Sequence, residues 1–199
     1  MSNYRKTFNY ILVFVTIMTA AIFIYLNQRE VSVIKSSYDN NYYVVKEAVD
    51  SEEAADILAK LKQDIFKITD YLYENRDKFP ENEEYIDQLY NRIQNVSIIE
   101  NTGNKYTSYT VNKGDQIVFC LRSKNEKRKG QLHDYNLIMY VALHEISHVA
   151  CPEQGHTQLF HEIFNFICSE AIKLGMYTKI DFNRDPQEYC GMTISTSIV

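Results

Sequence analysis

The sequence predicts an α+β protein, in which an amino-terminal transmembrane helix precedes a small, mostly helical domain with a β-hairpin or small sheet beside one of its helices. Three observations lead to this prediction. The first is an uncharged apolar run over 8–26. The second is the helical spacing of apolar residues over 51–74 and 160–172, and the third is a change to a β-rich composition over 106–122.

Composition limits the class of protein before any motif is considered. The chain has 199 residues, which is the length of about one domain. Its formal net charge of -5 weighs against a protein that mainly holds nucleic acid, because such domains carry a basic excess. The four cysteines are too few and too scattered for a disulfide scaffold. They are Cys120, Cys151, Cys168 and Cys190.

The apolar run over 8–26 is long enough, as a helix, to cross a bilayer of about 30 Å. It lacks the small-x-small cleavage site of a signal peptide, so we expect an uncleaved single-pass anchor. Arg5 and Lys6 precede the run, whereas Arg29 beyond it is offset by Glu30. The positive-inside rule then places the following domain on the non-cytoplasmic side of the membrane.

Four segments are expected along the chain. Residues 1–7 form a short tail and 8–26 the anchor. Residues 27–44 are polar and rich in tyrosine, which predicts a tether that becomes extended only near its end. The folded domain is expected over 45–199.

Two amphipathic helices open this domain. Apolar residues recur at helical intervals over 51–74, and Asp50 and Glu53 have the spacing of a capping box at its start. Pro80 marks the break that follows. A shorter helix is expected over 84–93.

A β-hairpin is expected next. The stretches 106–111 and 116–122 are rich in Tyr, Thr, Val, Ile and Phe, and they flank the turn-forming cluster at 112–115. The basic run at 124–129 is expected to be a solvated loop.

Two helices complete the domain. The first, over 137–150, is apolar almost all round, as a buried helix should be, and Pro152 closes it. The second carries an apolar stripe over 160–172 and ends near Gly175.

The buried helix contains the chemistry-bearing motif HEISH. His144 and His148 stand four residues apart on one helix face, so both imidazoles can reach a single zinc ion. Glu145 lies about 100° around the helix axis and can reach the water that such an ion activates. Burying these three groups without partners would cost several kcal/mol, so this spacing predicts a zincin-like Zn²⁺ site.

A catalytic zinc needs a third protein ligand from downstream. His156 is favoured because a turn containing Gly155 can bring the chain back to the metal. The alternatives that stay open are Glu162, Glu170 and Cys151. Two further histidines, His133 and His161, are expected to have no role.

The stretch SYTVNKGDQIVFCLR, followed by NLIMYVALHEISHVACPEQGHTQLFHEIF, resembles the zinc metallopeptidases of the WLM and SprT-like group. The likeness covers roughly 45–194 and is greatest to predicted peptidases of large DNA viruses, which would place the chain in a host or virion membrane. It implies zinc ligation by His144, His148 and His156, catalysis by Glu145, and a packing role for Phe160. The spacer between His148 and His156 is longer than in typical members of the group.

The resemblance implies a zinc-dependent metallopeptidase that acts on a protein or peptide substrate, with Glu145 as the general base. Such enzymes pair extended substrate with an edge strand, and 116–121 is the expected edge, with an ordinary internal strand as the alternative. The substrate-binding residues expected from this strand are Gln116, Val118, Cys120 and Arg122. Donors to the developing oxyanion are expected from Tyr177 or Tyr189.

One alternative function stays open, namely a non-catalytic zinc-binding domain that binds a partner, with Cys151 completing a closed site. The state of two cysteines also stays open. Cys120 and Cys190 can form a disulfide if the domain faces an oxidising compartment, or they can remain free and buried. Nucleic acid is not expected as a partner.

Overall fold

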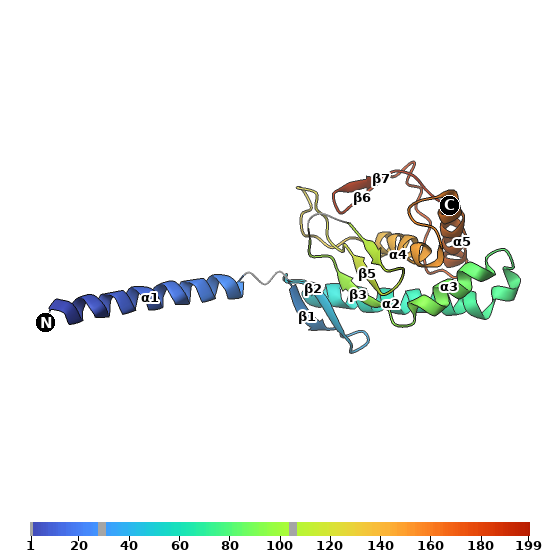
Figure 1. The fold of residues 1–199 in the computed structure, drawn as a ribbon. Coiled ribbons are helices and arrows are strands. Elements are labelled where there is room, and N and C mark those ends of the chain that lie inside the picture. Colours follow the sequence, from blue (N-terminus) through green and yellow to red (C-terminus); the bar gives the residue numbers. More distant parts are fainter. Residues whose placement is uncertain (1, 28–30, 104–106) are drawn as a thin grey trace.

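The structure is a computed structural model that describes residues 2–27, 31–103 and 107–199, with the side chains of the first helix described over 8–22. The helices, labelled in Figure 1, are α1 (Ser2–Asn27), α2 (Ser51–Glu74), the short 3₁₀ helix η1 (Arg76–Lys78), α3 (Glu83–Ile93), α4 (Tyr135–Ala150) and α5 (Gln158–Lys173). The strands are β1 (Val31–Lys35), β2 (Tyr42–Lys46), β3 (Ser97–Glu100), β4 (Tyr109–Val111), β5 (Gln116–Phe119), β6 (Gln187–Tyr189) and β7 (Met192–Ile194). The predicted α+β class is confirmed.

Helix α4 lies at the centre of the domain. The helices α2, α3 and α5 pack around it, together with strands β4 and β5. Its side chains are buried on nearly every side, which explains the continuous apolar sequence. It begins two residues before the predicted start at 137, because the Asp134 carboxylate accepts a hydrogen bond from the backbone N–H of Asn136 and caps the helix.

Helices α2, α3 and α5 form where the apolar spacing predicts them. The buried side chains of α2 include Leu58, Leu61, Ile65, Ile68 and Leu72, all fully enclosed. The predicted capping box at the start of α2 does not form, since Asp50 makes no side-chain cap. Its carboxylate instead pairs with Nη1 of Arg122 at 2.5 Å, so a tertiary contact replaces a local one.

The central sheet has the strand order β3-β5-β4. The antiparallel pairing of β4 with β5 confirms the predicted hairpin, although Tyr106 lies outside the described residues. Strand β3, which the sequence did not indicate, pairs parallel with β5 on its other side. The expectation of an edge strand at 116–121 is therefore wrong, because β5 has a neighbour on both sides, and β4 is the edge on the side of α4.

Strands β1 and β2 form an antiparallel hairpin that packs on α2. It occupies much of the span 27–44 that we expected to be a tether. Tyr43 and Val45 point into the core, and Val45 is fully buried. Alternate side chains of β2 thus pack on α2. This burial stabilises a strand pair in a segment whose polar composition predicted a linker.

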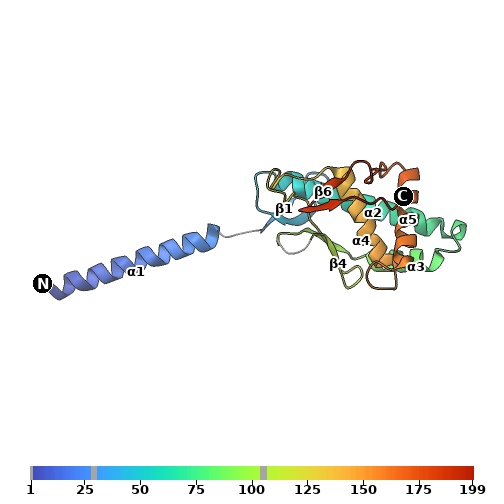
Figure 2. The same cartoon turned by 90° about the horizontal axis from the view of Figure 1, so that it is seen from above.

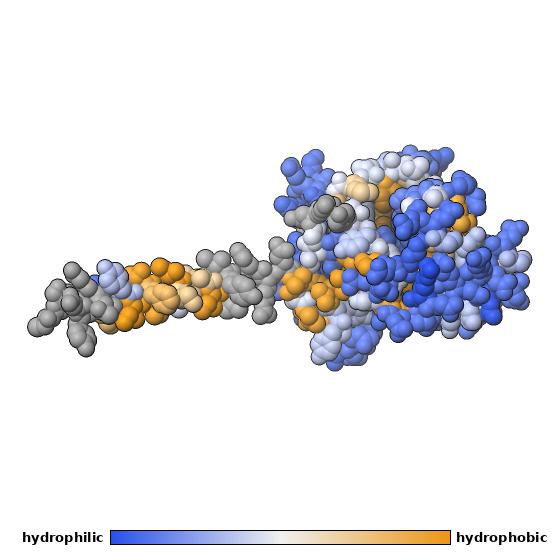
Figure 3. Space-filling model, in the orientation of Figure 1, coloured by the Kyte–Doolittle hydropathy of each residue, from blue (hydrophilic) through white to orange (hydrophobic). Residues whose placement is uncertain are grey.

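Helix α1 extends away from the rest of the chain in Figures 1 and 2, and Figure 3 shows an apolar surface along its described middle. No helix in the described part of the chain combines the length with the apolar character that crossing a bilayer requires. The predicted transmembrane helix over 8–26 is therefore wrong.

The prediction of a single-pass membrane location, with the domain on the non-cytoplasmic side, rested on that helix and is wrong for the same reason. Its orientation also depended on Arg29 and Glu30, which lie outside the described residues.

Candidate metal centre

Three histidines meet at the carboxyl-terminal half of α4. The Nε2 atoms of His144 and His148 lie 3.2 Å apart, those of His148 and His156 3.2 Å apart, and those of His156 and His144 3.0 Å apart. Four-residue spacing on one helix places the first two rings side by side, as the sequence predicts. The structure adds His156, so that three donor nitrogens face one point.

His156 reaches this point through a turn between α4 and α5. The chain leaves the helix at Cys151, which has extended backbone angles, and then reverses at Gly155, whose φ of +80° favours glycine. Thr157 caps α5 by accepting a hydrogen bond from the N–H of Phe160. The turn predicted from Pro152 and Gly155 therefore brings the third histidine back to the first two.

Phe160 packs against all three rings and is itself fully buried. Its ring stacks on that of His148 with centroids 4.2 Å apart, and it lies 4.9 Å from the rings of His144 and His156. An aromatic side chain in this position limits the rotation of each imidazole. It serves as the packing residue that the motif resemblance implies.

The histidine cluster fits a zinc ion in both geometry and charge. Tetrahedral coordination with Zn–N bonds of about 2.0–2.1 Å separates ligand nitrogens by about 3.3 Å, close to the spacing here. Burial, together with the neighbouring histidines, lowers the pKa of His144 to about 3 and that of His148 to about 4, and burial also lowers the pKa of His156. The rings are therefore neutral near pH 7, and their lone pairs are free for a metal.

Other predicted ligands lie elsewhere. Within the described part of the chain, the group that could hold a metal here consists of the three histidines. Glu162 accepts a hydrogen bond from Gln158, Glu170 pairs with Lys173, and Cys151 is a buried free thiol. His161 is exposed, with its ring 6.4 Å from that of His156.

Glu145 lies beside the histidines and is only 4% exposed. Its Oε2 accepts a hydrogen bond of 2.9 Å from Oγ1 of Thr110 on β4. Burial raises its pKa to about 7, against the opposing effect of this hydrogen bond. A carboxyl group with a pKa near neutrality can both accept and return a proton, which is what general base catalysis requires.

The histidines and Glu145 line one side of a cleft of about 770 Å³. Strand β4 and the residues before it form a second side, and the hairpin of β6 and β7 forms a third. The remaining lining residues are Thr107, Ser108, Tyr109, Thr110, Asn112, Lys113, Tyr140, Val141, Glu153, Gln154, Gly155, Tyr189, Met192 and Ile194.

The two predicted oxyanion donors have different surroundings. Tyr189 lines the cleft, and its hydroxyl lies 2.5 Å from that of Ser108. Tyr177 is buried outside the residues that line the cleft, and its hydroxyl accepts a hydrogen bond from the N–H of Ile180.

The residues expected to bind substrate from β5 do not line this cleft. They are Gln116, Val118, Cys120 and Arg122. Arg122 forms a buried ion pair with Glu100, with Nε 2.8 Å from Oε1, and a second pair with Asp50. In the structure, the guanidinium of Arg122 joins Glu100 on β3 to Asp50 at the start of α2 inside the domain.

Replacing Arg122 with Ala should lower the free energy of unfolding by about 3 kcal/mol. The substitution leaves the Glu100 carboxylate buried without its cation, and burial already raises the pKa of that group. Urea unfolding of the full chain would measure the change. Arg128→Ala, in the exposed loop that follows, is the matched control, and an Arg122→Ala variant as stable as this control would contradict the structural role.

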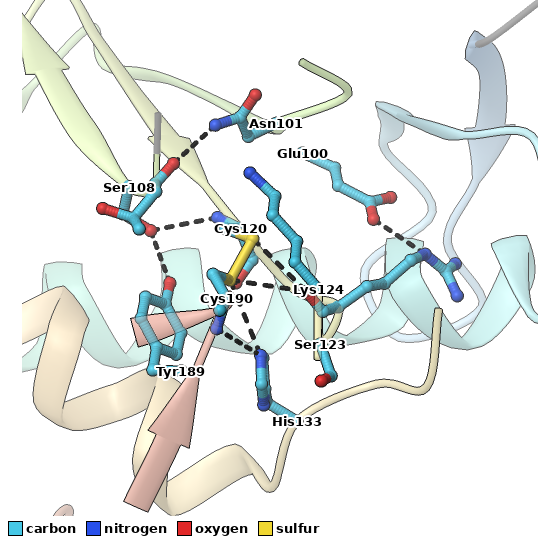
Figure 4. The surroundings of a disulfide bond; sticks show 12 residues. Glu100, Asn101, Ser108, Cys120, Ser123, Lys124, His133, Tyr189 and Cys190 are labelled. Atoms are coloured by element: carbon cyan, nitrogen blue, oxygen red, sulfur yellow. Dashed lines mark hydrogen bonds and ion pairs between the residues drawn. A yellow bond between two sulfur atoms is a disulfide. The ribbon is translucent and has the colours of Figure 1, made fainter. Parts of the chain in front are cut away.

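Cys120 and Cys190 form a disulfide between residues 70 positions apart (Figure 4). It ties the β6–β7 hairpin, which carries Tyr189, to the end of β5. His133, expected to have no role, is buried beside it, and its Nε2 accepts a hydrogen bond from the N–H of Cys190. The structure thus resolves the open alternative for these two thiols in favour of pairing, while Cys151 and Cys168 remain free.

Reducing this disulfide should destabilise the domain by about 2–4 kcal/mol, because a long loop gains freedom in the unfolded chain. Thermal unfolding with and without dithiothreitol would measure it. The double variant Cys120→Ser, Cys190→Ser should match the reduced protein and show no response to the reductant. A wild-type chain that is indifferent to dithiothreitol would rule out a stabilising bond.

Thr110 is a contact of Glu145 that the sequence did not indicate. The predicted hairpin already contained it, but its neighbour across the cleft, Glu145, is 35 positions away. Only the packing of β4 beside α4 brings the two together.

Comparisons with known proteins place the chain among viral proteins. It is 43% identical over 196 residues to Uncharacterized protein R325 of Acanthamoeba polyphaga mimivirus, which covers 96% of this chain and 98% of that protein. It is 31% identical over 163 residues to Uncharacterized protein 136R of Invertebrate iridescent virus 6, which covers 81% of this chain and 88% of that one. No family model matches the chain.

Among solved structures, the chain is similar to Wss1 from Saccharomyces cerevisiae at 18% identity. The similarity covers 51% of this chain and 84% of Wss1, with a TM-score of 0.35. A crystal structure of a Wss1 mutant gives a TM-score of 0.36 over 52% of this chain.

Proposed function

This chain belongs to the family of viral proteins that includes R325 of mimivirus and 136R of Invertebrate iridescent virus 6, and we propose that it is a zinc-dependent peptidase. The observation that carries this proposal is the convergence of three histidine nitrogens beside a buried glutamate on the side of an open cleft. His144, His148 and His156 would hold the metal, and Glu145 would act as general base.

The chain's own groups supply the proton transfers. A bound zinc ion would lower the pKa of water and polarise the scissile carbonyl. An Oε atom of Glu145 would accept a proton from the attacking water and later donate it to the nitrogen of the leaving amine. Thr110 holds the carboxylate in place through its hydroxyl, at 2.9 Å. The hydroxyl of Tyr189 would donate a hydrogen bond to the oxyanion as it forms.

Substrate would bind along β4 rather than β5. Strand β4 is the last strand in the order β3-β5-β4 of the described sheet, and Tyr109 and Thr110 line the cleft. An extended peptide could lie along β4 and form main-chain hydrogen bonds with it, which provide affinity without demanding a particular sequence. The apolar side chains of Val141 and Met192 would contact its side chains across the cleft.

The proposal is tested by measuring the zinc content of the purified full-length chain and its cleavage of a broad peptide library. We expect one zinc ion per chain and cleavage that a chelator abolishes and added zinc restores. Stoichiometric zinc without cleavage of any peptide would remove the enzymatic function and leave a non-catalytic zinc-binding domain.

A further inference from the structure

The segment 151–157, which carries His156, is held by a lysine from a different part of the chain. Residues 152–156 are all exposed. Nζ of Lys113, in the turn between β4 and β5, donates hydrogen bonds of 2.5 Å to the backbone carbonyls of Cys151 and Glu153. A single ammonium group therefore joins the central sheet to the segment that supplies the third histidine.

The turn that carries Lys113 is shaped and packed so that the side chain points this way. Asn112 and Lys113 have φ values of +46° and +55°, and the carbonyl of Val111 accepts from the N–H of Gly114 at 3.1 Å. Both residues therefore lie in the left-handed region of backbone conformation, which favours glycine. A Cβ added to Gly114 would lie 3.2 Å from Val149 Cγ1, so the turn packs directly on the end of α4.

Side chains from α3 hold the end of α4 itself. Gln88 Nε2 donates to the carbonyls of Val149 and Ala150, and Arg92 donates to that of Val149. These bonds from α3 satisfy carbonyls that a helix end leaves without partners. The carbonyls of Cys151 and Glu153 lie past the helix, and Lys113 is their donor.

We propose that Lys113 is a positioning residue that holds the segment 151–157 so that His156 meets His144 and His148, and that it thereby raises the affinity for zinc. The inference rests on the proposed zinc site. An unrestrained segment would have to become ordered when metal binds, and fixing each backbone residue costs about 1–2 kcal/mol. Holding the segment in advance removes part of that cost.

The sign of the effect separates this role from simple electrostatics. The Lys113 ammonium is a cation near the metal site, and it contributes to the lowered pKa of His148 after burial and His156. By charge alone it would repel a divalent cation, so its removal would strengthen zinc binding. If Lys113 acts by holding the segment, its removal must weaken zinc binding instead.

The test is a chelator-competition titration of zinc with the full-length chain and three variants. Lys113→Met should weaken zinc binding by about 10- to 100-fold, the usual effect of losing a group that orients a metal ligand. Lys113→Arg, which keeps the donors, should restore most of the affinity. Lys127→Met removes the same charge from an exposed loop and should leave zinc binding unchanged. Unchanged or stronger zinc binding in Lys113→Met would overturn the proposal.

A second measurement needs neither metal nor catalysis. Amide hydrogen exchange over 151–157 in the zinc-free chain should be faster in Lys113→Met than in the wild type and in Lys127→Met, and equal rates would also overturn the proposal. If Lys113→Met does not fold, as judged by circular dichroism, Lys113→Ala, which also lacks a side-chain donor, takes its place in both measurements. A wild-type chain that binds zinc but cleaves no peptide would end the peptidase proposal and leave this one standing. A chain without zinc affinity would end both.

Discussion

Replacing Glu145 with Gln is expected to lower the rate of peptide hydrolysis by about 10²- to 10⁴-fold while zinc stays bound. The amide keeps the shape of the side chain and its contact with Thr110, but it cannot accept a proton from the attacking water. Because burial raises the pKa of Glu145 to about 7, a neutral group at this position should not unfold the domain. Single-turnover cleavage assays, with zinc content measured on the same samples, would show the effect.

The matched control for this substitution is Glu162→Gln. Glu162 is exposed on α5 and accepts a hydrogen bond from Gln158, away from the cleft. It was also an open alternative for the third ligand, so unchanged zinc and unchanged activity in this variant would support both assignments. A Glu145→Gln variant that retains wild-type turnover would contradict the assignment of Glu145 as general base.

Replacing His156 with Ala is expected to weaken zinc binding by about 10²- to 10³-fold. Structural zinc sites with four ligands bind with about 10–16 kcal/mol, which corresponds to about 2.5–4 kcal/mol for each ligand. His156 is exposed, so its removal should take away a ligand without opening a cavity in the core. Chelator competition would measure the affinity, and thermal unfolding would show that the fold persists.

His161→Ala is the control for this change, since the ring of His161 is exposed and lies 6.4 Å from that of His156. We expect its zinc affinity to equal that of the wild type. Full zinc retention in His156→Ala would mean that a different residue completes the site.

Local patterns in the sequence were sufficient for the helices and for the first two members of the site. The apolar spacing of α2 and α5 reports which face is buried, and this follows from a helical period that depends only on near neighbours. The same period places His144 and His148 on one face. The turn at Gly155 is also local, which is why His156 could be chosen from the sequence.

Contacts between distant segments were outside the reach of such patterns. Strand β5 has the same composition whether it is an edge strand or an internal one, and its position was decided by β3, a strand of only four residues. Arg122 is chemically able to bind substrate, and only the proximity of Glu100 and Asp50 reveals its structural role. For the apolar run over 8–26, composition alone predicted a membrane-spanning helix, and the described structure does not support it.

The sequence by itself determined the class of the fold, the central helix and the histidine-glutamate motif, because each depends on spacing within one or two helical turns. The tertiary structure decided which strand edge lines the cleft, which cysteines pair, how Thr110 holds Glu145 and how Lys113 reaches the segment of His156. Each of these features depends on contacts between residues at least 19 positions apart. The packing of the whole domain decides which residues form these contacts, and no periodic pattern in the sequence indicates them.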